Sequence, residues 1–172
     1  FIECTGNRGG AIWTNIAENR VTVRRSTFLR CGSGEYSGAI HLRGEASIYD
    51  SHFIDVYSES EGGVAYMLSG AKLTMIGGSV IRARSAGRST SGSSFLCLRG
   101  GEATVVDVDV DDCEVAPADG TSLGPGVIRA TGASRLTLRR CRITRSGDAV
   151  TNIWGGAVAL AGGTQRALNR AA

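Results

Sequence analysis

The sequence predicts an all-β fold, a right-handed parallel β-helix (a β-solenoid) of about six coils. Two observations lead to this prediction. Short apolar segments recur every 25–33 residues, and one column of charged residues alternates in sign from each repeat to the next. Each repeat contains two or three β-prone segments without helical periodicity, which is typical of a β-solenoid. The 172 residues include 25 glycines but only two prolines, as tight turns between many short strands require.

The repeat is defined by an eight-residue segment whose first, third and eighth places are apolar. This pattern predicts a strand with one buried side. The spacing of the eighth-place residues grows along the chain, from 25 residues between Phe28 and Phe53 to 33 between Val110 and Ile143. Phe1 also falls on this place, so the chain is expected to begin within a repeat. The aligned copies are 21–28, 46–53, 73–80, 103–110 and 136–143.

A second strand follows a glycine or serine in every repeat. Side chains alternate between the two faces of a strand, so one residue of each copy points into the solenoid and the next points outward. On this frame the inward residues are apolar, among them Ile12, Ile40 and Leu96. The predicted outward residues are Trp13, His41, Tyr66, Cys97, Arg129 and Ala159.

A column of charged residues lies two places after the eighth place of each repeat. Its members alternate in sign and are Glu3, Arg30, Asp55, Arg82, Asp112 and Arg145. In coils stacked in register about 4.8 Å apart, each side chain would lie between neighbours of opposite charge. Such pairs contribute only about 0.2–1 kcal/mol each. We therefore interpret the column as a structural charge ladder that specifies register more than it stabilises the fold.

The acidic segment 107–112 has two interpretations. Its carboxylates resemble a cluster that could hold calcium through oxygen ligands; they belong to Asp107, Asp109, Asp111 and Asp112. However, valines alternate with the first three, which places the carboxylates on the outward face of a strand. In the next repeat Arg140, Arg142 and Arg145 align with Asp107, Asp109 and Asp112. We expect ion pairs between coils here, and neither a metal site nor a cofactor.

The chain has five cysteines. Cys4, Cys31 and Cys113 share one position of the repeat, where the other residues are small. We interpret them as inward-facing thiols that pack as small apolar residues. A disulfide between Cys4 and Cys31 is the alternative, because neighbouring coils bring residues within the range that such a bond needs. No Cys-x-x-Cys spacing suggests zinc.

The glycine-rich openings of the second strands resemble a known motif. Gly9-Gly10-Ala11-Ile12 and Gly155-Gly156-Ala157-Val158 are similar to the GGA[IV] repeat of the chlamydial polymorphic outer membrane proteins. Phe28-Leu29-Arg30-Cys31 resembles the Phe-x-x-Asn element of that family, with cysteine in place of asparagine. Similar repeats occur in surface proteins of algae and protists and in the wider pectin-lyase-like β-helix group. The resemblance implies an extracellular or cell-surface passenger with an elongated adhesive surface.

No pattern of residues predicts catalysis. The outward row lacks a carboxylate, whereas glycoside hydrolysis needs paired carboxylates. The predicted function is therefore a non-catalytic scaffold, adhesive or structural, whose partners are other coils of a longer chain or neighbouring proteins. One alternative is a polysaccharide-binding module that uses the rings of Trp13, His41 and Tyr66. Another is a fragment of a polysaccharide lyase or hydrolase whose catalytic coils lie outside the fragment.

The domain prediction is a set of β-helix coils at 1–163 and a C-terminal cap or linker at 164–172, where the composition favours a helix. Two inserts, 84–92 and 116–125, are expected to project from the coils as loops. The net charge of +3 is too small to favour nucleic acid as a partner. No apolar run reaches the length of a transmembrane helix.

Overall fold

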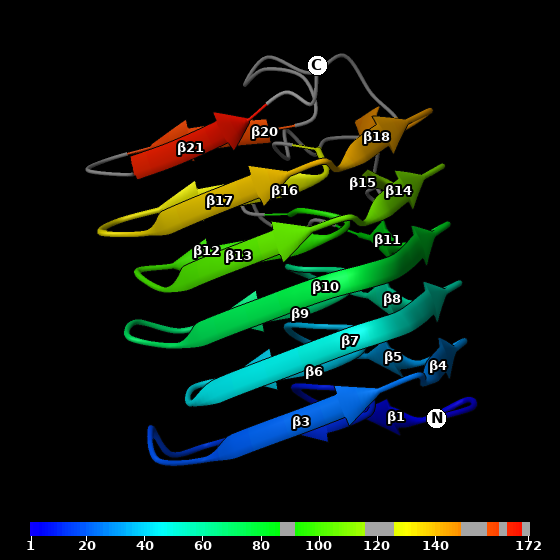
Figure 1. Ribbon diagram of the computed structural model, residues 1–172. Coiled ribbons are helices and arrows are strands. Elements are labelled where there is room, and N and C mark those ends of the chain that lie inside the picture. The colour runs from blue at the N-terminus through cyan, green and yellow to red at the C-terminus, as the bar shows by residue number, and fades with distance from the viewer. Residues whose placement is uncertain (87–91, 116–125, 149–157, 162–164, 170–172) are drawn as a thin grey trace.

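The computed structural model of the chain is an all-β parallel solenoid whose strands stack into three parallel sheets (Figure 1). It describes residues 1–86, 92–115, 126–148, 158–161 and 165–169, and the side chains as far as residue 146. These residues make about four turns and contain no helix. The parallel β-solenoid predicted from the sequence is confirmed. The right-handed sense and the number of six coils stay predictions.

Two of the sheets are six strands wide and consist of very short strands. Their neighbouring strands are parallel and in register; Cys97, for example, pairs with Tyr66 on one side and Arg129 on the other. The first sheet contains β1 (Thr5–Gly6), β5 (Gly32–Ser33), β8 (Tyr57–Ser58), β11 (Arg84–Ser85), β15 (Glu114–Val115) and β19 (Gly147–Asp148). The second contains β2 (Ile12–Trp13), β6 (Ile40–Leu42), β9 (Ala65–Met67), β12 (Leu96–Arg99), β16 (Ile128–Thr131) and β20 (Val158–Ala161).

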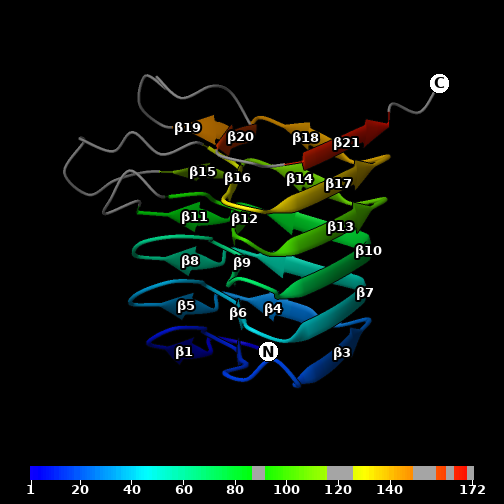
Figure 2. The ribbon, with the colours of Figure 1, turned by 90° about the vertical axis from the view of Figure 1, so that its left-hand side faces the viewer.

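The third sheet contains the strand that defines the repeat. Its register pairs Phe28 with Phe53, Phe53 with Val80, and Val80 with Val110, so the repeat frame predicted from the sequence is correct. Figure 2 shows the coils stacked one above another along the axis. The strands are β3 (Arg20–Arg24), β4 (Thr27–Leu29), β7 (Glu45–Ile54), β10 (Lys72–Ile81), β13 (Glu102–Val106), β14 (Asp109–Asp111), β17 (Arg135–Arg139), β18 (Arg142–Thr144) and β21 (Gln165–Asn169).

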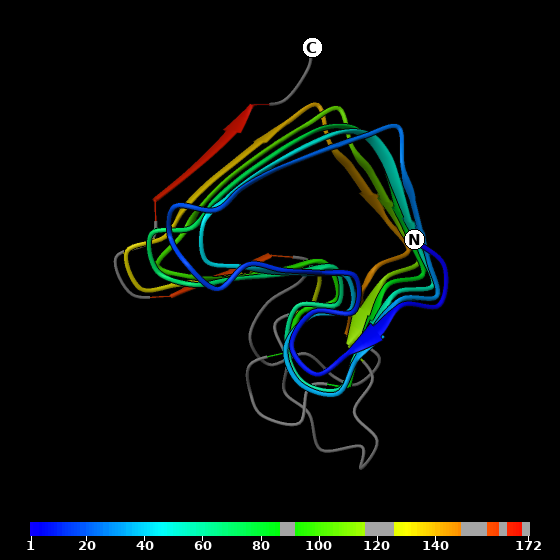
Figure 3. The same ribbon diagram turned by 90° about the horizontal axis from the view of Figure 1, so that it is seen from below.

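The core lies inside the tube that the three sheets enclose (Figure 3). The eighth-place residues stack along its axis: the ring centroids of Phe1 and Phe28 are 4.4 Å apart and those of Phe28 and Phe53 are 4.5 Å apart, with rings inclined by 3° and 7°. Phe28 and Phe53 are fully buried. Repetition of the same apolar position in each coil therefore becomes a continuous column of packed side chains.

The charged column of the sequence occupies a corner of the solenoid. All six of its residues have a positive φ, between 46° at Arg145 and 54° at Asp55. A second corner has the same left-handed conformation, with φ between 45° and 55° at Arg25, Asp50, Asp107 and Arg140, and glycine at the equivalent position 77. L-residues rarely adopt this conformation. Each coil therefore carries left-handed residues where its backbone changes direction.

The C-terminal segment forms a strand, although its composition favours a helix. Residues 165–169 form β21, which pairs with β17, so this part of the predicted cap or linker adds a strand to the stack. The pairing gives the backbone N–H and C=O groups of β17 hydrogen-bonding partners. A helix at 165–169 would leave these groups of β17 without such partners. The insert 116–125 and residues 87–91 of the other insert lie outside the described residues. No helix in the described part of the chain is long and apolar enough to cross a membrane.

Candidate functional site

The outward residues of the second sheet form a continuous row across β2, β6, β9, β12 and β16. We call this the outer row; its described members are Trp13, His41, Tyr66, Cys97 and Arg129. The sequence placed them correctly in one register. Ala159 of β20 pairs with Arg129 in the same register, but its side chain is not among those described.

The three rings of the outer row do not form the open platform that the alternative of a polysaccharide-binding module required. Trp13 is 53% exposed, whereas His41 and Tyr66 are each 3% exposed. Tyr36, on the connection that precedes β6, packs against both buried rings. Its ring centroid lies 5.4 Å from that of His41 and 4.9 Å from that of Tyr66. The frame was right, but the position of this connection could not be inferred from strand periodicity. Only Trp13 presents its ring to solvent.

His41 is a buried, neutral imidazole. Burial is the main cause that lowers its pKa, and the nearby charge of Arg8 acts in the same direction. Its Nδ1 atom has no hydrogen-bonding partner among the described residues. This side chain therefore packs between aromatic rings and does not offer solvent an acid or base.

A buried polar cluster covers the middle of the outer row. Glu61, 5% exposed, accepts a hydrogen bond from Arg99 Nη2 at 2.5 Å, and its other carboxylate oxygen lies 3.5 Å from Cys97 Sγ. The guanidinium carbon of Arg99 lies 5.7 Å from the ring centroid of Tyr66. Neither Glu61 nor Arg99 was among the residues predicted from the sequence. The nearest signal was a single carboxylate directly before Gly62-Gly63, at a connection whose course the sequence does not specify.

Burial controls ionisation within this cluster. It raises the pKa of Glu61 even though the nearby charge of Arg99 acts in the opposite direction. It also raises the pKa of the Cys97 thiol to about 12, with the charge of Glu61 as the second cause. The thiol is consequently protonated at neutral pH and a poor nucleophile.

Arg129 ends the described part of the row. Its Nη1 atom is buried and has no hydrogen-bonding partner among the residues whose side chains the structure describes. Together with Arg99 it lines a shallow concavity of about 480 Å³, whose other lining residues are Ser69, Gly100, Thr131, Gly132 and Ala133. The two arginines thus give one end of the outer row a basic surface.

The opposite end of the row is apolar and lies on the first coil. Trp13 lines a concavity of about 350 Å³ together with Gly6, Asn7, Arg8 and Gly9. The guanidinium carbon of Arg8 lies 6.0 Å from the ring centroid of Trp13. An exposed indole beside polar groups is the kind of surface on which a sugar ring or a protein side chain can pack.

The predicted charge ladder forms ion pairs at two of its steps. Arg30 Nη2 lies 2.6 Å from Glu3 Oε1, and Arg82 contacts both carboxylate oxygens of Asp55, at 2.6 and 2.9 Å.

The last step of the ladder differs from the prediction. Arg145 contacts Asp111, with its Nε atom 3.0 Å from Oδ1, and its ion pair is with this residue rather than with Asp112. Asp112 lies instead 3.6 Å from Arg84. Neighbours in the alignment are therefore not always partners, although all six ladder residues share the left-handed conformation.

The acidic segment is matched by arginines of the following coil. Arg140 contacts Asp107 at 2.6 Å and Arg142 contacts Asp109 at 3.2 Å, as the alignment predicted. The hydrogen bond from Arg145 is the main cause that lowers the pKa of Asp111 to about 2. Guanidinium groups thus occupy the carboxylates that a cation would require.

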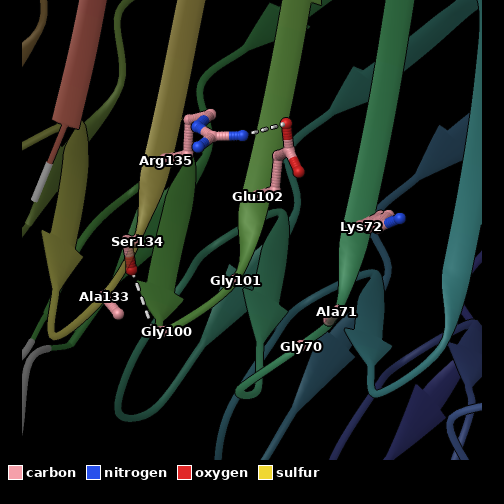
Figure 4. Close-up of a pocket in the computed structure, with 9 residues that line it drawn as sticks. All are labelled: Gly70, Ala71, Lys72, Gly100, Gly101, Glu102, Ala133, Ser134 and Arg135. Carbon is pink, nitrogen blue, oxygen red and sulfur yellow. Dashed lines mark hydrogen bonds and ion pairs between the residues drawn. The ribbon is translucent and has the colours of Figure 1, made fainter.

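A second alternating column, which the sequence analysis missed, lies at the start of the third sheet. Its members are Arg20, Glu45, Lys72, Glu102 and Arg135. Arg20 lies 3.1 Å from Glu45, Lys72 lies 3.8 Å from Glu45, and Arg135 lies 3.6 Å from Glu102. Figure 4 shows the last pair beside a concavity of about 350 Å³. The charged side chains that line this concavity thus form ion pairs with residues of neighbouring coils.

The cysteines are free thiols. Cys31 and Cys113 are buried as predicted, and Cys4 is partly buried. Cys4 and Cys31, the pair considered for a disulfide, are both free, and their thiols donate to backbone carbonyls of Ile2 and of Phe1 and Leu29. Burial raises the pKa of Cys113 to about 11.

No protein-family model, curated protein or solved structure matches the chain.

Proposed function

We propose that this chain is a non-catalytic scaffold of an extracellular or cell-surface protein, with an adhesive or structural role in a larger assembly. We further propose that its solenoid is right-handed and similar to the β-helical passengers of the chlamydial polymorphic outer membrane proteins. The observation that carries the proposal is that charged side chains of neighbouring coils contact one another. Columns of side chains form ion pairs from one coil to the next. These contacts specify stacking.

The first coil provides a surface for the partner that a scaffold needs. Phe1, Ile2, Trp13 and Ile16 are 48%, 66%, 53% and 51% exposed. Strands β1, β2 and β3 each lie at the end of a sheet, with neighbours on one side only. Exposed apolar side chains beside unpaired strand edges favour addition of another strand. We therefore propose a further β-solenoid coil as the occupant.

The charges of the first coil specify which coil would fit. Glu3 would face a basic residue, whereas Arg20 and Arg25 would face acidic ones, because like charges stacked directly are destabilising. On the described side, Glu3 and Arg20 already have partners of opposite sign, Arg30 and Glu45. The incoming coil is thus expected to continue the two alternating columns at Glu3 and Arg20 and to place an acidic residue opposite Arg25 at the second corner.

The experiment adds one repeat before Phe1. A matched version carries arginine opposite Glu3 and glutamate opposite Arg20 and Arg25, and a reversed version exchanges these charges. Each pair contributes about 0.2–1 kcal/mol, and Tm changes by about 2–4 °C per kcal/mol in a chain of this size. We expect the matched version to melt several degrees higher at low salt, and the difference to shrink in 1 M salt, where the screening length is about 3 Å. Equal melting temperatures would contradict the stacking role.

The exposed indole supports a second candidate, a polysaccharide-binding module centred on Trp13. Tyr66 is excluded from it because it is buried. Co-sedimentation with insoluble polysaccharides tests this function, with Trp13→Ala as the variant and Ile16→Ala, also on the exposed first coil, as the control. Binding lost only in Trp13→Ala would favour carbohydrate recognition. Absence of binding by the folded chain would leave the scaffold as the proposal.

A further inference from the structure

Arg129 differs from most of the arginines around it. The described side chains of Arg82, Arg99 and Arg140 each contact a carboxylate. By contrast, the Nη1 atom of Arg129 is buried and has no hydrogen-bonding partner within the part of the chain that the structure describes. A buried donor on a cation is costly unless a partner satisfies it. The protein thus leaves unused hydrogen-bonding capacity at this place.

A second guanidinium lies on the same face of the sheet. Arg129 of β16 pairs in register with Cys97 of β12, and Arg99 lies two residues further along β12. Residues two apart point to the same side of a strand. Strand spacing and rise place the two Cα atoms about 8 Å apart. Both arginines line the concavity of about 480 Å³ at this end of the outer row.

We infer that Arg99 and Arg129 form a binding site for an oxyanion, the sulfate or phosphate group of a ligand. The nearby carboxylate is Glu61, which Arg99 contacts at 2.5 Å. One carboxylate beside two guanidinium groups leaves about one positive charge, which an anion would neutralise. Arginine is well suited to this role because its planar fork donates parallel hydrogen bonds to oxyanions.

The donors that line the concavity come from different coils. Ser69 follows β9, Arg99 ends β12, and Arg129 belongs to β16. Donors approaching from several directions suit a tetrahedral group, with oxygens at four corners, better than a planar carboxylate. The binding site is independent of the stacking surface on the first coil, so it goes beyond the proposed scaffold function.

Glycine keeps the concavity open beside the arginines. Gly100 has a φ of 82°, and a Cβ atom there would lie 3.1 Å from Ser69 Oγ. Gly132, in the next coil, has a φ of 65°. Both turns thus adopt a conformation that glycine favours, and neither places a side chain over the guanidinium groups.

Titration of the intact chain with inorganic sulfate, inorganic phosphate and acetate tests the site. Calorimetry measures the affinity, and the Nε–Hε NMR signals of the arginines report which side chain responds. We expect dissociation constants on the order of millimolar for the two tetrahedral anions. Arg129→Gln is expected to weaken binding by about tenfold or more, since hydrogen bonds to charged groups are strong. Arg43→Gln removes the same charge from an exposed side chain and is expected to change the affinity less than about twofold.

The outcomes separate specific binding from simple screening. An Arg129 signal that shifts saturably with sulfate or phosphate, and less with acetate, supports the site. Equal responses to sulfate, acetate and chloride, or an unchanged affinity in folded Arg129→Gln, would overturn it. Sugar sulfates and sugar phosphates then distinguish the source of the group, because the one that binds tighter than its inorganic ion identifies the ligand class.

Discussion

The corner residue Arg82 offers a test of what the charge-ladder position requires. Its φ is 53°, and its guanidinium contacts both carboxylate oxygens of Asp55. The left-handed conformation costs a residue other than glycine about 1–2 kcal/mol. The ion pair, with side chains 47% and 37% exposed, contributes about 0.2–1 kcal/mol. Arg82→Gly removes both terms and adds the entropic cost of glycine, about 0.5–1 kcal/mol, so its free energy of unfolding should stay within about 1 kcal/mol of wild type.

Arg82→Val is expected to behave differently. It loses the same ion pair but places a β-branched side chain in the left-handed region, where such residues are outliers. The free energy of unfolding should fall by about 2–3 kcal/mol. Urea denaturation followed by circular dichroism measures both variants.

The matched control is Arg142→Val. Arg142 lies in β18, outside the left-handed corner, and contacts Asp109 at 3.2 Å. An extended strand favours valine, so this variant should stay within about 1 kcal/mol of wild type although it also loses an ion pair. The reasoning is refuted if Arg82→Val is as stable as Arg82→Gly, or if Arg142→Val loses as much as Arg82→Val.

Three further predictions concern the core, the thiols and pH. Phe28→Ala should lower the free energy of unfolding by about 3–5 kcal/mol, and Phe1→Ala by clearly less because Phe1 is 48% exposed; equal losses in urea denaturation would contradict the aromatic column. Cys97 and Cys113 should resist iodoacetamide at pH 8 while Cys4 reacts, because burial raises the pKa values of Cys97 and Cys113 to about 12 and 11. Mass spectrometry of the labelled native chain measures the extent of reaction at each thiol, and equal labelling of the three would refute the prediction. The lowered pKa of Asp111 stabilises the fold above the ordinary value of 3.8, and this contribution is lost as pH falls toward about 2. Between pH 4 and 2, the Tm of Asp111→Asn should therefore fall less steeply with pH than the Tm of wild type. Equal dependence of Tm on pH in the two proteins would exclude the contribution.

The sequence by itself determined the solenoid and its register. An apolar residue at the same place of each repeat, from Phe28 to Ile143, forms one buried column when the coils stack in parallel, and the structure pairs these residues directly. The outer row followed from the same frame, because alternation along a strand is a local property.

Only the tertiary structure decided what covers that row and which charges meet. Tyr36 and Glu61 lie on connections between strands, and the course of a connection depends on packing that no period in the sequence records. Alignment alone did not give the partner of Arg145 either, because its guanidinium contacts Asp111 rather than the aligned Asp112. Periodicity therefore predicts faces and neighbours, whereas burial and hydrogen-bonding partners depend on contacts between segments far apart in the chain.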